Sequence, residues 1–233
     1  MQPFRTFLAI LADSRRGYLL AAASPALPPF RETRGPSGGL PLHPFFRTLR
    51  KPKQMSHKAE AVFVPLNIAV LTVSDTRTFE TDTSGQLFVD RLEAAGHFLA
   101  DRVLLKDDLY RIRAQVAHWI AEDQVQVVLI TGGTGFTGRD STPEAVACLL
   151  DKQVDGFGEL FRQISVADIG TSTVQSRALA GLANGTLVCC LPGSTNACRT
   201  AWDGILAEQL DNRHRPCNFV PHLKQAEPCG PRG

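Results

Sequence analysis

The sequence predicts a protein of the α/β class, with a three-layer αβα fold built around a mostly parallel sheet. Two observations support this prediction. Short runs of β-branched and apolar residues, typical of strands buried on both faces, alternate with amphipathic segments of about a dozen residues. The chain also lacks an internal repeat. Alternation of this kind places helices on both faces of one parallel sheet.

The first predicted strand is the uninterrupted apolar run from Asn67 to Val73. An amphipathic helix follows from Ser84-Gly85, and Gly96 ends it at a C-cap position, where glycine is favoured. Residues 98–105 form the second predicted strand. The next helix starts at Leu109, because apolar residues recur from there at helical spacing. Those residues are Leu109, Ile112, Val116, Trp119 and Ile120.

The second half of the body repeats the alternation. Residues 125–130 form a third predicted strand, and Thr142-Pro143-Glu144 starts a helix with a cap hydroxyl and proline at N1. Residues 186–191 form a late strand, and a late helix runs from Ser194 to Leu210. In such a sheet, ligands bind beyond the carboxyl ends of the strands. The loops predicted to carry the functional site therefore follow Val73, Leu105, Ile130 and Leu191.

Residues 1–54 differ in composition from the rest of the chain. They hold nine of the 25 basic residues, two of the 23 acidic residues and eight of the 15 prolines. We predict an unstructured extension there and a single domain over residues 55–233. Three interpretations of the extension stay open: a misassigned start before Met55, a plain extension, or an arginine-rich, acid-poor targeting segment. A secretory signal is excluded, because residues 13–16 interrupt the only apolar run.

Composition excludes several classes of protein. The longest apolar runs fall far short of the roughly 20 residues of a membrane-spanning helix. The apolar fraction of 43% and net charge of +2 exclude disorder of the whole chain. Six cysteines without a C-x-x-C pair indicate free thiols in a reducing compartment, and we predict a cytoplasmic protein. Beyond residue 54 acids outnumber bases, so we expect no binding to nucleic acid and none to membranes.

The loop after the third strand is rich in glycine. Thr131-Gly132-Gly133-Thr134-Gly135 lets backbone amides approach an anion, while Arg139 suits a phosphoryl group and Asp140 suits Mg²⁺. Gly133, Gly135 and Gly138 match the dinucleotide pattern G-x-G-x-x-G. However, the helix begins about four residues late for that pattern, and residues 151–155 are not expected to end a strand. Arg139-Asp140 stands where a Walker A motif needs Lys-Ser/Thr. The alternative is a glycine-rich turn without a ligand.

Three other segments are notable, and the first two have two open interpretations each. Lys106-Asp107-Asp108 follows the second strand and fits either a helix N-cap or a catalytic pair of acids. Leu191-Pro192-Gly193-Ser194 fits either a second anion-binding loop or an N-cap serine after a turn. Gly156-Phe157-Gly158-Glu159 places one acid between flexible points and an apolar run. Neither a Ser/His/Asp nor a Cys/His trio has a recognisable spacing.

These motifs, in their order and spacing, resemble the MoaB/MogA family of molybdenum cofactor biosynthesis. The resemblance runs from Pro65 to Lys224 and implies a Rossmann-like fold of MoaB/MogA type. It is strongest for the MoaB branch, from residues 175–178, 197–202 and 215–219. The motifs that carry it are Thr131–Gly135, Arg139–Ala145, Gly156–Glu159, Ser176-Arg177 and Leu191–Ser194.

The resemblance implies that the protein is a molybdopterin adenylyltransferase. Such an enzyme transfers AMP from Mg·ATP to the phosphate of molybdopterin and releases pyrophosphate. Two family acids map onto Asp107 and Asp140 as catalytic residues, with Asp140 also holding Mg²⁺. Members of the MoaB branch sometimes lack one or both acids, and both are present here. Lys106 stands where the family more often has proline.

The resemblance further implies a homo-oligomer (trimer or hexamer) that works with other molybdenum cofactor biosynthesis proteins. It also implies a set of residues that bind substrate and nucleotide. The set is Ser74, Asp75, Thr131, Gly132, Gly133, Thr134, Gly135, Arg139, Thr142, Glu159, Ser176, Arg177, Pro192, Gly193 and Ser194.

Three functions therefore stay open: the adenylyltransferase, a protein that binds molybdopterin without turning it over, and a dinucleotide-dependent oxidoreductase. The last depends only on the literal glycine pattern.

Overall fold

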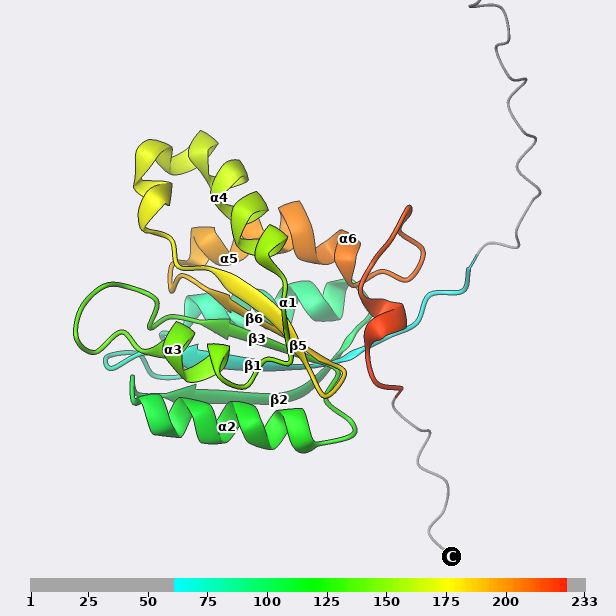
Figure 1. The fold of residues 1–233 in the computed structure, drawn as a ribbon, viewed down its shortest axis with the longest axis horizontal. Coiled ribbons are helices and arrows are strands. Elements are labelled where there is room, and N and C mark those ends of the chain that lie inside the picture. The colour runs from blue at the N-terminus through cyan, green and yellow to red at the C-terminus, as the bar shows by residue number, and fades with distance from the viewer. Residues whose placement is uncertain (1–60, 226–233) are drawn as a thin grey trace, which may run out of the picture. The chain divides into compact units, whose positions relative to one another are not determined.

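A computed structural model describes residues 61–225; the extension predicted for residues 1–54 lies outside the described residues. Figure 1 shows a six-stranded sheet between two layers of helices, which confirms the predicted three-layer α/β fold. The strands are β1 (Asn67–Val73), β2 (Phe98–Leu105), β3 (Val127–Thr131), β4 (Lys152–Gln153), β5 (Leu179–Ala183) and β6 (Thr186–Leu191). The main helices are α1 (Thr83–Ala94), α2 (Leu109–Ala121), α3 (Thr142–Ala147), α4 (Asp155–Ile169) and α5 (Thr195–Ala201). Shorter helical segments are η2 (Gly170–Gln175), η3 (Trp202–Leu206), α6 (Ala207–Gln209) and η4 (Val220–His222).

The strand order is β2-β1-β3-β6-β5-β4, and the four strands from β2 to β6 are parallel. Strand β5 runs antiparallel to both of its neighbours, so the sheet is mostly and not wholly parallel. Asn184 and Gly185 join β5 to β6 with φ angles of 47° and 70°. Two successive residues with positive φ make the two-residue turn that matches the twist of a hairpin. The sequence carries this Asn-Gly signal, but we did not predict β5 or β4 from it.

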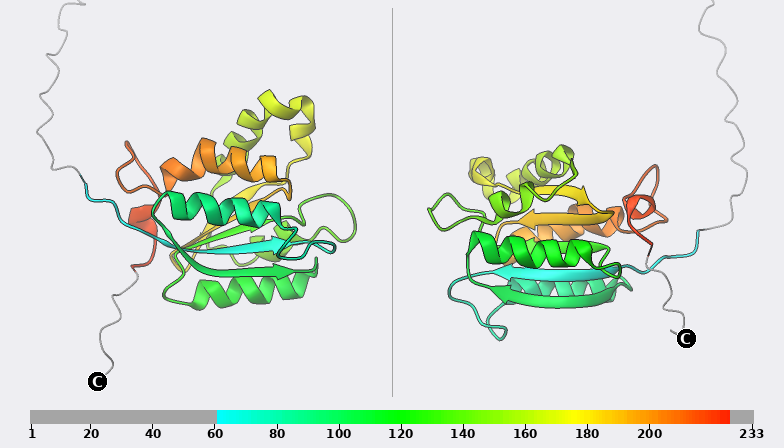
Figure 2. Two further views of the ribbon diagram at one scale, coloured as in Figure 1. Left: turned by 180° about the vertical axis from the view of Figure 1, so that it is seen from behind. Right: turned by 60° about the horizontal axis from the view of Figure 1, so that its bottom comes forward.

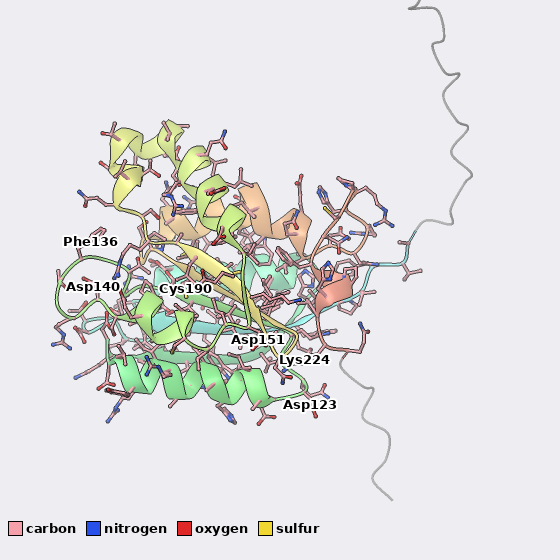
Figure 3. All side chains as sticks on the ribbon, viewed as in Figure 1. Asp123, Phe136, Asp140, Asp151, Cys190 and Lys224 are labelled. Carbon is pink, nitrogen blue, oxygen red and sulfur yellow. The ribbon has the colours of Figure 1, made fainter. Side chains whose placement is uncertain are left out.

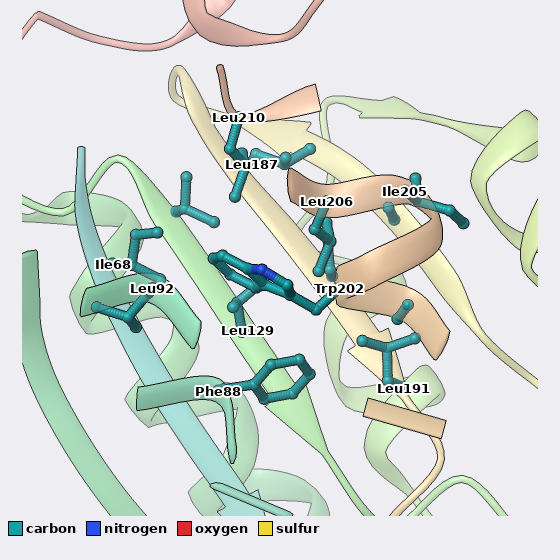
Figure 4. Close-up of a cluster of buried hydrophobic side chains, with 14 of the residues drawn as sticks. Ile68, Phe88, Leu92, Leu129, Leu187, Leu191, Trp202, Ile205, Leu206 and Leu210 are labelled. Carbon is teal, nitrogen blue, oxygen red and sulfur yellow. The ribbon is translucent and has the colours of Figure 1, made fainter. Parts of the chain in front are cut away.

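Each face of the sheet has its own hydrophobic core. Ile68 and Val70 of β1 point into one core, and Ala69 and Leu71 point into the other, as the alternation of a strand requires. Helices α1, α4 and α5 cover the first face, and α2 and α3 cover the second (Figures 1 and 2). In the first core Trp202 packs among Phe88, Leu92, Leu129 and Leu206 (Figure 4).

The helix ends mostly confirm the predicted boundaries. Asp82 caps α1 by accepting a hydrogen bond from the amide of Gly85. The helix stops before Gly96, whose φ is +88°, and the amide of His97 then donates to the carbonyl of Leu92. The predicted late helix is one helical run from Thr195 to Gln209, but its middle turn, η3, is π-helical. No helix of the described residues is long and apolar enough to cross a membrane.

The predicted cap of α3 is wrong. Ser141 occupies the N-cap position, but no side chain caps the helix. The hydroxyl of Ser141 donates instead to Asp107, 2.7 Å away. The hydroxyl of Thr142 is buried and has no hydrogen-bond partner among the described residues. Thr142, which the sequence predicted as the cap, is instead the first residue of α3.

The cysteines agree with the prediction of free thiols. Cys189, Cys190 and Cys198 are buried, and Cys148 and Cys217 are exposed; all five are free. Burial raises the pKa of Cys198 to about 11, so this thiol stays protonated at neutral pH. Cys229 lies outside the described residues.

His97 makes stability depend on pH. It is buried, and its Nδ1 accepts a hydrogen bond from the amide of Leu66. Burial lowers the pKa of His97 below its ordinary value of 6.5, although the charge of Asp211 partly offsets this. Between the lowered pKa and 6.5 the unfolded chain binds a proton at this residue that the folded chain does not bind. The contribution of His97 to stability is therefore present above pH 6.5 and decreases as the pH falls below it.

We expect the free energy of unfolding of the wild type to fall between about pH 7 and pH 5, by an amount that His97→Asn removes. Asparagine keeps a hydrogen-bond acceptor and does not titrate. Urea denaturation of both proteins across this range measures the difference. Equal pH dependence in the two proteins would contradict the assignment to His97.

Candidate functional site

Four loops meet at the carboxyl ends of β1, β2, β3 and β6, as the parallel part of the sheet requires. Figure 3 shows Asp140 and Phe136 in the glycine-rich loop at this edge, with Asp123 and Lys224 at the opposite edge. A cavity of about 280 Å³ lies between the loops. It is lined by Thr72, Val73, Ser74, Arg77, Thr131, Gly132, Gly133, Thr134, Gly135, Asp140 and Gly193.

The glycines of the loop after β3 have different roles. Gly132 and Gly133 have φ angles of +98° and +62°. A Cβ at Gly132 would lie 2.1 Å from the carbonyl oxygen of Val73, so the loop leaves β3 in close contact with the end of β1. A Cβ at Gly135 would lie 2.7 Å from Oδ2 of Asp140. At Gly138, by contrast, a Cβ would meet nothing within 4 Å. The first three glycines therefore allow close packing around the cavity, and Gly138 does not.

This geometry separates the loop from a dinucleotide-binding turn. Helix α3 begins at Thr142, four residues after Gly138, so the glycine pattern does not open a helix. We expected no strand near residues 151–155, and this was wrong, because Lys152–Gln153 form β4. However, β4 is separated from β3 by β6 and β5. The acid that follows it, Asp155, therefore starts α4 away from the glycine-rich loop.

Arg177 holds the glycine-rich loop in shape. Its Nε donates to the carbonyl of Thr134 at 3.0 Å, and its Nη2 donates to the carbonyls of Gly135 and Asp140. Its Nη1 pairs with Glu144. Because all three nitrogens donate to protein atoms, Arg177 stabilises the loop.

A second network joins the loops after β1, β2 and β3. Oδ1 of Asp75 accepts a hydrogen bond from Nη2 of Arg139 at 2.9 Å and from the amide of Asp107 at 3.4 Å. Oδ1 of Asp107 accepts from both the amide and the hydroxyl of Ser141. The next residue, Asp108, caps α2 by accepting from two backbone amides. Of the two adjacent acids, Asp108 is thus a helix cap, while Asp107 joins the loops after β2 and β3 and does not itself line the cavity.

The two predicted catalytic acids differ in their tendency to ionise. Burial raises the pKa of Asp107, and the charges of Asp140 and Asp75 raise it further, against the opposing hydrogen bonds from Ser141. The hydrogen bond from the Thr137 side chain lowers the pKa of Asp140, and the charge of Arg177 adds to this effect. Asp140 is therefore the carboxylate that stays ionised to lower pH, and Asp107 retains a proton more readily.

The acids fit Mg²⁺ only together with phosphate oxygens. Within residues 61–225 no group of three or more His, Cys, Asp or Glu side chains is arranged to hold a metal ion. Mg²⁺ that accompanies a nucleotide needs only one or two carboxylates, because phosphates and water supply its other ligands. Asp140 suits this role. Its Oδ2 accepts hydrogen bonds from the amide and the hydroxyl of Thr137, and the backbone of Gly135 also helps to stabilise the ionised carboxylate.

Seven of the fifteen predicted binding residues line the cavity, namely Ser74, Thr131, Gly132, Gly133, Thr134, Gly135 and Gly193, and the other eight do not. The carbonyl of Pro192 accepts from the hydroxyl of Thr131, and Thr142 packs against Gly133. The hydroxyl of Ser194 caps α5 by accepting a hydrogen bond from the amide of Ala197. Glu159 lines a separate pocket of about 320 Å³ between α4 and β5. The buried hydroxyl of Ser176 has no partner among the described residues.

Three residues that line the cavity were not predicted from the sequence: Thr72, Val73 and Arg77. Thr72 and Val73 are the last residues of β1, and they were interpreted only as strand. Arg77 lies two residues beyond Asp75 on the same loop, so its place after a strand end was the available signal.

Fold and cavity together define a three-layer α/β domain with a glycine-lined site at the carboxyl edge of its sheet. Residues 69–212 match the family model described as a probable molybdopterin binding domain. The chain belongs to the MoaB/MogA family of molybdenum cofactor biosynthesis proteins, and within it to the MoaB branch.

Individual relatives agree with this assignment. Molybdenum cofactor biosynthesis protein B of Escherichia coli (strain K12) is 59% identical over 163 residues, which cover 70% of this chain and 96% of that protein. A crystal structure of molybdenum cofactor biosynthesis protein B is 44% identical with a TM-score of 0.61, and covers 63% of this chain and 92% of its own. The tungsten cofactor synthesizing protein MoaB from Pyrococcus furiosus is 34% identical with a TM-score of 0.56, at coverages of 62% and 92%.

Proposed function

We propose that the protein is a molybdopterin adenylyltransferase, which transfers AMP from Mg·ATP to the phosphate of molybdopterin and releases pyrophosphate. The observation that supports this proposal most directly is the position of Asp107 and Asp140. The two acids come from the loops after β2 and β3 and lie close enough for their charges to interact. Asp140, the glycine-rich loop and Gly193 line the cavity, and Asp107 lies next to it on the loop after β2.

Nucleotidyl transfer requires little covalent chemistry from a protein. The phosphate oxygen of molybdopterin attacks the α-phosphorus of ATP, the bond to the β-phosphate oxygen breaks, and pyrophosphate leaves. Catalysis depends on alignment of the two phosphates and on stabilisation of charge. Gly132, Gly133 and Gly135 line the cavity, and glycine backbone can approach phosphate oxygens closely.

Two charged side chains, Asp140 and Arg139, would act on Mg²⁺ and the phosphates in this mechanism. Asp140 is the group that would hold Mg²⁺, because its carboxylate is ionised and lines the cavity. When bound, Mg²⁺ neutralises charge on the phosphate oxygens. Arg139 is exposed, and its guanidinium forms an ion pair with Asp75, which links the loops after β1 and β3.

A second candidate function is binding of molybdopterin without turnover. It is favoured by one observation: both acids already accept hydrogen bonds from the protein, Asp107 from Ser141 and Asp140 from Thr137. In that case the acids would serve to shape the loops. Incubation of the purified protein with molybdopterin and Mg·ATP separates the two functions. An adenylyltransferase releases pyrophosphate only when both substrates are present, whereas a binding protein retains molybdopterin and releases none.

We also propose that the protein is a cytoplasmic homo-oligomer, trimeric or hexameric, that acts with other proteins of the pathway. Exposed apolar side chains on α4 and η2 support a contact between subunits at these two helices. They are Leu160, Val166, Ile169 and Val174, with exposed fractions of 41%, 52%, 49% and 78%.

The site predicts a preference among nucleotides. We expect Mg·ATP to bind measurably and NAD and NADP to show no binding, because the loop cradles phosphate but lacks two parts of a dinucleotide site. Those parts are a helix opened by the glycine pattern and an acid on the neighbouring strand for the ribose. Isothermal titration calorimetry of the full chain measures this. Tight binding of NAD with none of Mg·ATP would reverse the assignment.

A further inference from the structure

Arg77 lines the cavity opposite the glycine-rich loop and belongs to none of the predicted functional residues. It lies on the loop after β1, where its amide donates to the hydroxyl of Ser74 at 3.2 Å. Its side chain is 31% exposed, so the guanidinium is neither fully buried nor free in solvent. A cation at this position faces the same space as the backbone of Gly132, Gly133 and Gly135.

Only one nitrogen of the Arg77 guanidinium, Nη1, has partners among the described residues. Its Nη1 donates to the hydroxyl of Ser84 at 2.8 Å and lies 3.5 Å from Oδ1 of Asp82. The hydroxyl of Ser84 donates in turn to the carbonyl of Gly193, on the other wall of the cavity. Nε and Nη2 of Arg77 make no hydrogen bond within residues 61–225 and remain available as donors.

The charge of Arg77 is only partly compensated. Asp82 is 2% exposed and accepts hydrogen bonds from the hydroxyl of Thr72 and the amide of Gly85. It also forms a closer ion pair with Arg102, at 3.0 Å. Two guanidinium groups thus share one carboxylate, so the charge of Asp82 can neutralise only one of them. An anion in the cavity would complete this arrangement.

We propose that Arg77 is a phosphate-binding residue of the cavity, and that Ser84 and Asp82 are positioning residues that orient its guanidinium. The ligand chemistry is a phosphate oxygen, which either the nucleotide or the phosphate of molybdopterin supplies. The identity of that phosphate depends on the proposed function, but anion binding by Arg77 does not. Arginine suits this role, because its rigid fork can donate to the phosphate through atoms that Asp82 and Ser84 leave unused.

Calorimetry with pyrophosphate, Mg·ATP and molybdopterin tests this proposal without requiring turnover. The variants are Arg77→Met, Arg77→Lys and, as a control, Arg213→Met. Arg213 lies over the ring of Phe63, just before β1, and therefore at the opposite edge of the sheet. Thermal denaturation of each variant reports whether the fold is intact.

We expect Arg77→Met to raise the Kd of pyrophosphate by about tenfold or more, since a charge-assisted hydrogen bond is lost. Arg77→Lys should recover part of the affinity, and Arg213→Met should bind as the wild type does. Weakened binding of Mg·ATP together with pyrophosphate assigns Arg77 to the nucleotide, and weakened binding of molybdopterin alone assigns it to the pterin phosphate. Either result supports phosphate binding by Arg77.

Wild-type affinity of Arg77→Met for all three ligands would overturn the proposal, as would a wild type that binds none of them. If Arg77→Met does not fold, Arg77→Lys carries the test, and full wild-type affinity in this variant overturns recognition by the guanidinium fork. Ser84→Ala tests positioning: a smaller rise in Kd supports it, and unchanged binding removes Ser84 from the proposal. Absence of turnover in a wild type that binds pyrophosphate through Arg77 would contradict the proposed function and leave this inference standing.

Discussion

Replacement of Asp140 by asparagine is expected to lower the rate of adenylyl transfer by about two orders of magnitude or more, roughly 3 kcal/mol of transition-state stabilisation. The carboxylate lines the cavity, and the hydrogen bond from the Thr137 side chain keeps it ionised. Asparagine preserves its shape and one oxygen acceptor, so the amide of Thr137 can still donate to it. The loss therefore arises from the missing charge, and molybdopterin binding should persist.

Asp108→Asn is the matched control for this variant. It makes the same change of carboxylate to amide on the neighbouring loop, where Asp108 caps α2 and does not line the cavity. Asparagine caps helices as well as aspartate does, so turnover and stability should stay near wild type. Steady-state rates and urea denaturation of the three proteins measure both effects. Equal, substantial turnover in wild type and Asp140→Asn would refute the catalytic role, and unfolding of the variant would assign Asp140 to loop structure.

Gly132→Ala is expected to destabilise the protein by about 3 kcal/mol and to abolish ligand binding. The φ angle of +98° is unfavourable for a residue with a Cβ. The added carbon would lie 2.1 Å from the carbonyl oxygen of Val73, a backbone atom that cannot move without disturbing β1. For a domain of this size, the melting temperature should fall by roughly 10 °C.

Gly138→Ala makes the same change six residues further along the loop. A Cβ there would meet nothing within 4 Å, and the φ angle is not positive. Its melting temperature and its affinity for Mg·ATP should both match the wild type. A similar loss in both variants would show that the loop needs glycine for general flexibility and not for the close approach at Gly132.

The fold was predictable where a strand is buried on both faces. β1, β3 and β6 are uninterrupted apolar runs, and each was found within two residues of its bounds. β4 consists of only two residues, and both are exposed. β5 has the sequence Leu-Ala-Gly-Leu-Ala, which contains no β-branched residue. Neither has a pattern of its own: β5 is placed by its pairing with β6 through the Asn184-Gly185 turn, and β4 by its pairing with β5.

The site was predictable in its location but not in its internal hydrogen bonding. Two adjacent acids, Asp107 and Asp108, look equivalent in sequence. They differ only because the fold brings Ser141, 34 positions away, against the first of them. The position of Arg77 depends likewise on Asp82, which is buried by α1 and β2. Local pattern places a residue on a loop, and tertiary contacts decide what it does there.

ATP labelled at a single phosphorus distinguishes adenylyl transfer from binding without turnover. The full chain is incubated with molybdopterin and Mg·ATP that carries the label at either the α- or the γ-phosphate. Adenylyl transfer predicts that α-label enters the pterin, that γ-label appears in pyrophosphate, and that one pyrophosphate forms for each labelled pterin. Retention of bound molybdopterin without label from either ATP would contradict the adenylyltransferase and identify a binding protein.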